Sequence, residues 1–307
     1  MLNRFTKGWT KLLAAFAGLA LTACATQPAE TAPAAAASGE MRPALWRLSD
    51  PDTNIYLFGT IHTLPEGVDW RTPAIEAAIA ASDELVTEIV IPDDPMAAMG
   101  TMMRLGMGQG LPPILERVPA GKREALSAAI ASSGLPAAIF DRMKTWTAAV
   151  TLAAIAFQRA GLDPERGVER SLAATFRQRQ KPWSGLETMD EQLGFFDSLP
   201  EAEQRTFLVG VLESPEEIRR EFDGMLASWT SGDIAAIART FDDEAKMSAN
   251  LRETLLVRRN SRWAEWLQRR LDRPGTVFVA VGAGHLAGRD SVQDMLQRRG
   301  LRAERVQ

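Results

Sequence analysis

Two apolar segments near opposite ends of the chain each lead into the same short motif, Gly-x-x-His. One motif follows the apolar run 55–58 and ends at His62, and the other follows the run 277–281 and ends at His285. No other histidine occurs among the 307 residues. Short runs of apolar and β-branched residues are typical of buried strands. The repeated motif therefore predicts two strand–turn units that pair within one sheet and bring both imidazoles together.

The chemistry of the two motifs indicates a functional site. Functional groups in open α/β sheets gather beyond the carboxyl ends of the strands, where both histidines are expected. Gly59 and Gly282 open the two turns, and the absence of a Cβ there permits a close approach of other groups. Imidazole is a general base and a metal ligand near neutral pH. Two histidines are too few for a stable divalent ion, so a metal site needs a carboxylate as well.

Three glutamates are candidates for that carboxylate. Glu88 interrupts the apolar run 85–91, where a charged group is costly unless it is paired or bound. Its alternative is a solvent-facing position on an edge strand. Glu187 ends a predicted strand, and Glu169 stands at a predicted helix start. For these two glutamates the alternative is helix capping.

Arg259 and Asn260 lie on the predicted helix 243–271, which leads into the final strands. Surface charge is the ordinary role of such a basic segment. The alternative is a guanidinium that holds a carboxylate or a substrate group through two hydrogen bonds. Asn260 could hydrogen-bond to a metal-binding side chain and so fix its orientation.

The N-terminus has the pattern of a secretory signal. Residues 1–23 combine three basic residues with a short apolar stretch, and Leu-Thr-Ala-Cys at 21–24 looks like a bacterial lipobox. We expect cleavage before Cys24 and a lipid on its sulfur, so that the chain is held on a membrane of the cell envelope. The site faces the periplasm, and the outer membrane is favoured because Ala25 is not Asp. The alternative is an ordinary signal peptide and a free cysteine.

Residues 24–43 are rich in Ala and Pro and predict a disordered tether. The domain then extends over 44–307, and no further segment reads as transmembrane. Without residues 1–23, 32 basic residues face 39 acidic ones, a net charge of −7 with neutral histidines. This sign disfavours nucleic-acid binding. A peptide or a small molecule is the expected substrate, and the oligomeric state is left open.

The pattern of elements predicts an α/β fold with a central mixed sheet, flanking helices and a large all-helical insertion at about 94–180. The methionine-rich helix 95–105 either packs in the core or forms a pliable lid. The expected strands are 44–49, 54–61, 84–91, 181–186, 276–281 and 301–306. The other expected helices are 72–82, 120–132, 145–160, 189–196, 201–212, 214–228, 233–241 and 290–299.

The ordered set of motifs resembles the TraB/PrgY/GumN family, which is related to the Tiki membrane metalloproteases. The matching segments are 57–62, 87–88, 167–169, 185–188, 191–193, 259–260 and 279–288. The resemblance implies a fold like that of erythromycin esterases and haem-binding ChaN-like proteins. It also implies a hydrolytic site in which His62, His285 and Glu88 bind a divalent ion such as zinc, manganese or cobalt. Glu169 stands where the family often has Asp.

Three functional hypotheses follow. The first is a lipid-anchored periplasmic metalloprotease-like hydrolase, in which Glu187 moves the proton, Arg259 stabilises the oxyanion and Glu169 assists. The second is a metal-free esterase that uses one histidine as its base. The third is a module that binds haem or a peptide without turnover. The sequence has no His-Glu-x-x-His helix, serine nucleophile elbow or phosphate loop, which disfavours the corresponding enzyme classes.

Overall fold

The computed structural model describes residues 41–92, 94–242 and 248–307. Its centre is a six-stranded mixed sheet with the strand order β4-β3-β5-β2-β1-β6. The strands β4, β3, β5 and β2 are parallel to one another, whereas β1 is antiparallel to both β2 and β6. The strands are β1 (Leu45–Ser49), β2 (Thr53–Thr60), β3 (Glu84–Thr87), β4 (Trp183–Gly185), β5 (Gly275–Gly282) and β6 (Glu304–Arg305).

Helices fill most of the remaining chain, and polar caps mark the start of several of them. Ser214 and Thr188 begin helices with reciprocal hydrogen bonds to a glutamate three residues later. The helices are α2 (Pro73–Ala81), α3 (Pro95–Gly106), α4 (Arg123–Ser132), α5 (Ala137–Arg142), α6 (Thr145–Arg159), α7 (Val168–Gln178), α8 (Met189–Asp197), α9 (Glu201–Gly210), α10 (Pro215–Thr230), α11 (Ile234–Asp242), α12 (Ala249–Arg252), α13 (Arg258–Arg270) and α14 (Val292–Arg298).

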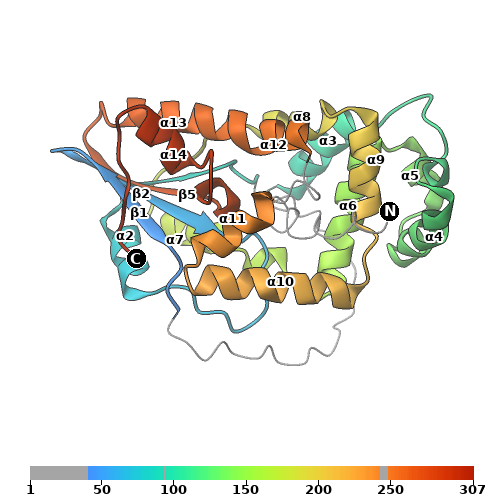
Figure 1. Cartoon of the computed structure of the whole chain (residues 1–307), viewed down its shortest axis with the longest axis horizontal. Helices are drawn as coiled ribbons and strands as arrows, with labels where there is room; N and C mark the ends of the chain where they lie inside the picture. Colours follow the sequence, from blue (N-terminus) through green and yellow to red (C-terminus); the bar gives the residue numbers. More distant parts are fainter. Residues whose placement is uncertain (1–40, 93, 243–247) are drawn as a thin grey trace.

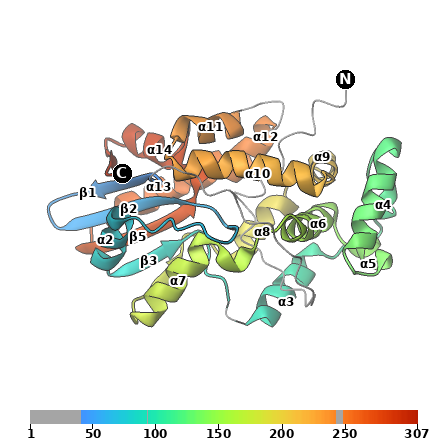
Figure 2. The same ribbon diagram turned by 90° about the horizontal axis from the view of Figure 1, so that it is seen from below.

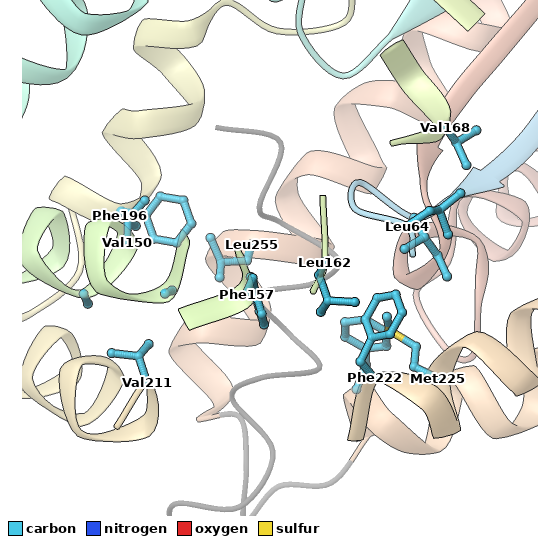
Figure 3. Packing of buried hydrophobic residues seen from close by; sticks show 14 of the residues in the cluster. Leu64, Val150, Phe157, Leu162, Val168, Phe196, Val211, Phe222, Met225 and Leu255 are labelled. Carbon is cyan, nitrogen blue, oxygen red and sulfur yellow. The ribbon is translucent and has the colours of Figure 1, made fainter. Parts of the chain in front are cut away.

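The sheet is buried on both faces, which explains why β5 is apolar along most of its length. Val277, Val279 and Val281 face one hydrophobic core, and Phe278 and Ala280 face the other. The first core is bounded by α13 and α14. The second core is larger and extends beyond the sheet into the helical part of the molecule, as Figure 3 shows for a portion of it.

The helices of the middle of the chain lie beyond one end of the sheet. In both views α3, α4, α5 and α6 stand apart from the strands (Figures 1 and 2). Figure 1 shows α13 and α14 above the sheet and α2, α7 and α10 below it. Between residues 95 and 178 the described elements are helices and short 3₁₀ turns. Parallel strands direct their carboxyl ends toward this helical part, so the junction receives the turns that follow the strands.

The α/β fold with a mixed sheet and flanking helices is confirmed. The hairpin of β1 and β2 is present, and the two Gly-x-x-His strands are neighbours, with Thr60 paired to Gly282. Three boundaries were predicted wrongly. The strand expected over 84–91 ends at Thr87, because the chain then turns. Residues 243–247 of the helix expected over 243–271 lie outside the described residues. In the described part, Ser248 caps α12, and a π-helical turn, Glu253–Val257, separates α12 from α13. The last strand covers only Glu304–Arg305.

The methionine-rich helix α3 divides its side chains between core and surface. Met102 is buried, whereas Met96 and Met103 are 73% and 56% exposed. The signal peptide, Cys24 and the tether lie outside the described residues. Across 41–92, 94–242 and 248–307, every helix falls short of the length and apolarity that a membrane crossing requires.

Candidate functional site

The four parallel strands each deliver one predicted site residue just beyond their carboxyl ends. In the spatial order of the sheet these residues are Glu187, Glu88, His285 and His62, which follow β4, β3, β5 and β2. All four residues are at most 7% exposed. Residues that are distant in sequence therefore meet at one edge of the sheet because parallel strands end there together.

His62 is held by a carboxylate from the start of α7. Its Nδ1 lies 2.6 Å from Oε1 of Glu169, and the hydroxyl of Thr60 donates to the same oxygen. Nδ1 therefore carries the ring proton, and in the neutral ring the lone pair is on Nε2. Glu169 reaches this position because Val168 N–H donates to the Ile61 carbonyl at 3.1 Å. A histidine oriented by a carboxylate is the arrangement of a general base.

His285 is fixed by hydrogen bonds at both ring nitrogens. Its Nδ1 lies 2.6 Å from Oδ1 of Asn260, whose Nδ2 donates to the Asp290 carbonyl at 2.7 Å. That second bond sets the orientation of the amide, so Nδ1 of His285 is the donor. Nε2 then accepts from Nη1 of Arg259 at 3.1 Å, because a guanidinium can only donate. Burial and the Arg259 charge lower the pKa of His285 from 6.5 to about 3, so the ring is neutral.

Arg259 is fully buried and is the hub of the site. Its Nη2 donates to Oε2 of Glu88 at 2.6 Å and to Oε2 of Glu187 at 2.9 Å, and its Nε donates to both oxygens of Glu187. The guanidinium also lies 4.7 Å from the centre of the Trp263 ring. Arg259 thus binds a carboxylate through two hydrogen bonds, as one interpretation of the basic segment predicted. Arg258 has the other role, surface charge, because its side chain is 66% exposed.

Glu88 lies in the wall of a cavity and accepts hydrogen bonds on both oxygens. Gly282 N–H donates to Oε1 at 2.8 Å, and the Gln192 amide donates to Oε2 at 3.0 Å, beside Arg259. Burial alone would raise the pKa of Glu88. The positive charge of Arg259, the two histidines when protonated, and the Gly282 bond outweigh it, and the pKa falls from 4.5 to about 2. Glu88 is thus an ionised, buried carboxylate, and not a solvent-facing residue on an edge strand.

Glu187 is enclosed by donors from α13. Besides Arg259, Arg262 Nη2 and Trp263 Nε1 each donate to its Oε1 at 3.1 Å. Burial raises the pKa of Glu187, and the charges of Arg259 and Arg262 oppose that rise. The helix cap that follows is supplied by Thr188, so Glu187 is not the capping residue.

A cavity of about 580 Å³ opens in front of these strand ends. His62, Glu169, Glu88 and Gln192 are part of its wall, whereas His285, Arg259 and Glu187 are not among its lining residues. The remaining lining residues are mostly apolar or basic: Leu64, Pro65, Val68, Trp70, Ile89, Ile91, Pro164, Ala173, Ala174, Trp183, Arg166, Arg170 and Arg177. Only one of the two imidazoles therefore borders the space that a substrate could enter.

The predicted site residues converge, in two connected parts. His62 and Glu169 form one part at the cavity, and Glu88, Glu187, His285, Arg259 and Asn260 form the buried part. When protonated, the two histidines act electrostatically on each other and on Glu88, so the parts adjoin. Gly282 contributes an N–H to Glu88. Gly59 packs against Ala283, where a Cβ would meet the Ala283 Cα at 3.1 Å.

Sequence reasoning did not identify three residues that orient the site: Thr60, Gln192 and Trp263. The ring of Trp263 lies 4.4 Å from that of His285, centre to centre. Gln192 directly follows the Thr188–Glu191 capping box, which was a readable signal for its place on the first turn of α8. Nothing in the sequence around Thr60 indicates its contact with Glu169.

The buried part does not offer an open position for a divalent ion. Within the described residues, no three His, Cys, Asp or Glu side chains are grouped for metal binding. The donor set explains why, because the lone pair of His285 Nε2 and Oε2 of Glu88 both face Arg259. A metal bound by both residues would require the guanidinium to move. The metal ligand set of His62, Glu88 and His285 stays a prediction.

Comparison with known proteins gives a family match and two kinds of bacterial relative. The sequence model of the TraB/PrgY/gumN family matches residues 44–305. An Escherichia coli K12 protein with the description "Uncharacterized protein YbaP" is 25% identical over 80% of this chain and 88% of its own length. An uncharacterized protein of Treponema pallidum is 23% identical over 83% of this chain and 80% of its own. No solved structure matches significantly.

Proposed function

We propose that this chain, which belongs to the TraB/PrgY/gumN family, is a hydrolase that uses His62 as its general base. The observation that supports this most directly is the 2.6 Å contact between His62 Nδ1 and Glu169 in the wall of the cavity. A carboxylate in this position orients the imidazole and stabilises its protonated form. The reaction assigned is hydrolysis of an ester or amide.

In the proposed step, Nε2 of His62 removes a proton from water as the water oxygen bonds to the substrate carbonyl carbon. The bond from that carbon to the leaving oxygen or nitrogen then breaks, and the imidazolium returns its proton to the leaving group. Glu169 stabilises the positive ring in between. Glu88 keeps its negative charge because Arg259, Gln192 and Gly282 hold it.

The cavity wall supports a substrate with an apolar body. Trp70, Trp183 and Ile89 supply apolar surface. Of the charged lining residues, Arg170 pairs with Glu165 of the same wall at 3.0 Å, and Arg177 lies over the Trp183 ring. A volume of about 580 Å³ is in the range of small-molecule sites. We therefore assign a short peptide or a small ester with an apolar body as the substrate class.

The test is turnover by the purified chain on a panel of fluorogenic esters and short peptides. We expect His62→Gln and Glu169→Gln to lower kcat/KM by about 10²-fold to 10⁴-fold, the usual contribution of general base catalysis. Glu124→Gln, which changes an exposed glutamate on α4, is the matched control. Absence of turnover by the unaltered chain, with capture of haem or peptide instead, would favour the binding module.

A second candidate is the metal-dependent hydrolase that the family resemblance implies. Its supporting observation is that both histidines have Nδ1 bonded to an oxygen acceptor, as metal-ligating histidines commonly do. Zinc, manganese or cobalt would then be held by His62, Glu88 and His285. Activity that a chelator abolishes and one of these metals restores would favour this candidate, whereas chelator resistance supports the metal-free reaction.

We also propose that the chain is a lipoprotein of the bacterial cell envelope, anchored through Cys24 and facing the periplasm. The lipobox-like sequence at 21–24 supports this proposal. Metabolic labelling with a fatty acid analogue should mark the chain and fail in Cys24→Ser. Labelling that persists in the variant contradicts the anchor.

A further inference from the structure

The buried part of the site already contains a cation. We infer that the guanidinium of Arg259 is the resident cation of the pocket formed by Glu88, Glu187 and His285, and that this pocket binds no divalent metal in the native chain. The inference does not depend on the metal-free hydrolase reaction, because it concerns occupancy and not turnover. It excludes the second candidate, in which Glu88 and His285 bind a metal ion. It makes Arg259 a positioning residue for Glu88, which borders the cavity.

The hydrogen-bond directions at His285 are the first step of the argument. Asp290 fixes the Asn260 amide, and that amide fixes the proton of His285 on Nδ1. The lone pair of Nε2 is then available to one partner, and Nη1 of Arg259 lies 3.1 Å from it. A zinc ion bonds imidazole nitrogen at about 2.0–2.1 Å, so an ion on Nε2 and the present guanidinium would exclude each other.

The charges are the second step. Glu88 and Glu187 place two carboxylates around one site that is nearly closed to water. Arg259 donates to both of them, at 2.6 Å and 2.9 Å through the same Nη2. Guanidinium suits such sites because it is planar, weakly hydrated and permanently charged. A divalent ion beside it would add like charge at close range, which is unfavourable in a buried setting.

The aromatic surroundings of Arg259 are the third step. Trp263 and Phe195 lie with their ring centres 4.7 Å and 5.4 Å from the guanidinium carbon. Aromatic faces attract a broad, weakly hydrated cation, and they offer no bond to a transition metal. The guanidinium is therefore surrounded by three kinds of group that favour it: two carboxylates, two aromatic rings and the imidazole of His285.

Metal occupancy is the direct test, with Arg259→Ala and Arg262→Ala as matched variants. Arg262 also donates to Glu187 from α13 but is 49% exposed. The unaltered full chain should carry well under one metal ion per molecule, and cobalt(II) should add no visible ligand-field absorption. In Arg259→Ala the emptied pocket should bind cobalt(II), with new absorption bands and a higher melting temperature on metal addition. Arg262→Ala should behave like the unaltered chain.

A stoichiometric metal ion in the unaltered chain, removed by a chelator with a fall in melting temperature, would overturn the inference. Because Arg259→Ala removes the buried cation that Glu88 and Glu187 share, the variant could fail to fold. Nitrogen NMR of the unaltered chain therefore gives an independent decision. The sequence has two histidines, so His62→Gln identifies the His285 signals. We expect the neutral Nδ1–H form, unchanged by zinc(II) or by a chelator; a shift of Nε2 with either reagent contradicts the inference. These readouts do not depend on turnover, so they fail separately from the hydrolase proposal.

Discussion

Gly167 lies directly against the backbone of His62, and a Cβ built at residue 167 would come within 2.2 Å of the His62 carbonyl oxygen. This close approach lets α7 begin beside the strand end, and it brings Glu169 to the imidazole. Gly167 therefore allows the contact between His62 and Glu169.

Replacing Gly167 with Ala should disturb that pair. The added methyl group meets backbone atoms that cannot move independently, so we expect a loss of about 1–3 kcal/mol of stability, as for other overpacked sites. Turnover should fall with it. Gly194→Ala in α8 is the matched control, because nothing lies within 4 Å of a Cβ there and alanine favours a helix. Urea denaturation of both variants measures the difference, and equal midpoints would contradict the prediction.

Acid should destabilise the chain through His285. Its folded pKa is about 3 against an ordinary value of 6.5, because burial and Arg259 disfavour the charged ring. Below pH 6.5 the unfolded chain binds a proton that the folded chain does not, so stability falls as the pH drops. Between pH 6.5 and 4.5 the loss from this group is about 2–3 kcal/mol. Glu88, with a pKa of about 2 against 4.5, adds a loss in the same direction below pH 4.5.

The variant His285→Gln tests this assignment, since a glutamine oxygen can still accept from Arg259 but does not titrate. Melting temperatures recorded from pH 7 to pH 4.5 should decline less steeply for the variant than for the unaltered chain. Parallel curves would show that His285 does not set the acid sensitivity.

Asn260 should be required for the fixed state of His285. In Asn260→Ala the buried Nδ1–H loses its acceptor, and an unsatisfied buried donor costs about 1–3 kcal/mol. Asn250→Ala is the control, because the amide of Asn250 on α12 is exposed and makes only 3.3 Å contacts with Glu203. Chemical denaturation should show a lower free energy of unfolding for Asn260→Ala than for Asn250→Ala. Equal free energies of unfolding for the two variants would contradict the prediction.

Arg117 should be the main anchor of the helical part. Its side chain is buried and donates to the carbonyls of Pro112, Asp141 and Met143 at 2.6–2.8 Å. Arg117→Ala leaves these carbonyls without that donor, and we expect a loss of at least about 3 kcal/mol. Arg117→Lys should rescue little, because one ammonium cannot reproduce the guanidinium fork. Arg123→Ala, which changes an exposed arginine, is the control and should have the same urea midpoint as the unaltered chain. An unchanged urea midpoint for Arg117→Ala would contradict the prediction.

The parts of the fold that sequence could predict are those with a strong local pattern. The apolar runs before His62 and His285 are two paired central strands because continuous apolar residues suit a sheet buried on both faces. The strand before Glu88 was predicted too long, since its continuation at 89–91 is also apolar. Those residues turn into the cavity wall instead, where Ile89 and Ile91 remain close to apolar neighbours.

The site was predictable in its members but not in its partnerships. Sequence position placed Glu187 at a strand end, Glu88 within an apolar run and Glu169 at a helix start. It could not assign Glu169 to His62 or Glu88 to Arg259. That choice depends on packing between segments 107 to 171 residues apart. Arg258 and Arg259 are neighbours in sequence, and only the rotation of α13 decides which one is buried.

The most direct test of the account is a double-mutant cycle on His62 and Glu169, measured as kcat/KM on the best substrate found. If the two residues act as one base, His62→Gln combined with Glu169→Gln should be no slower than His62→Gln alone, because residues that act as a unit are strongly non-additive. Losses that multiply, or single variants that retain full activity, would contradict the central claim.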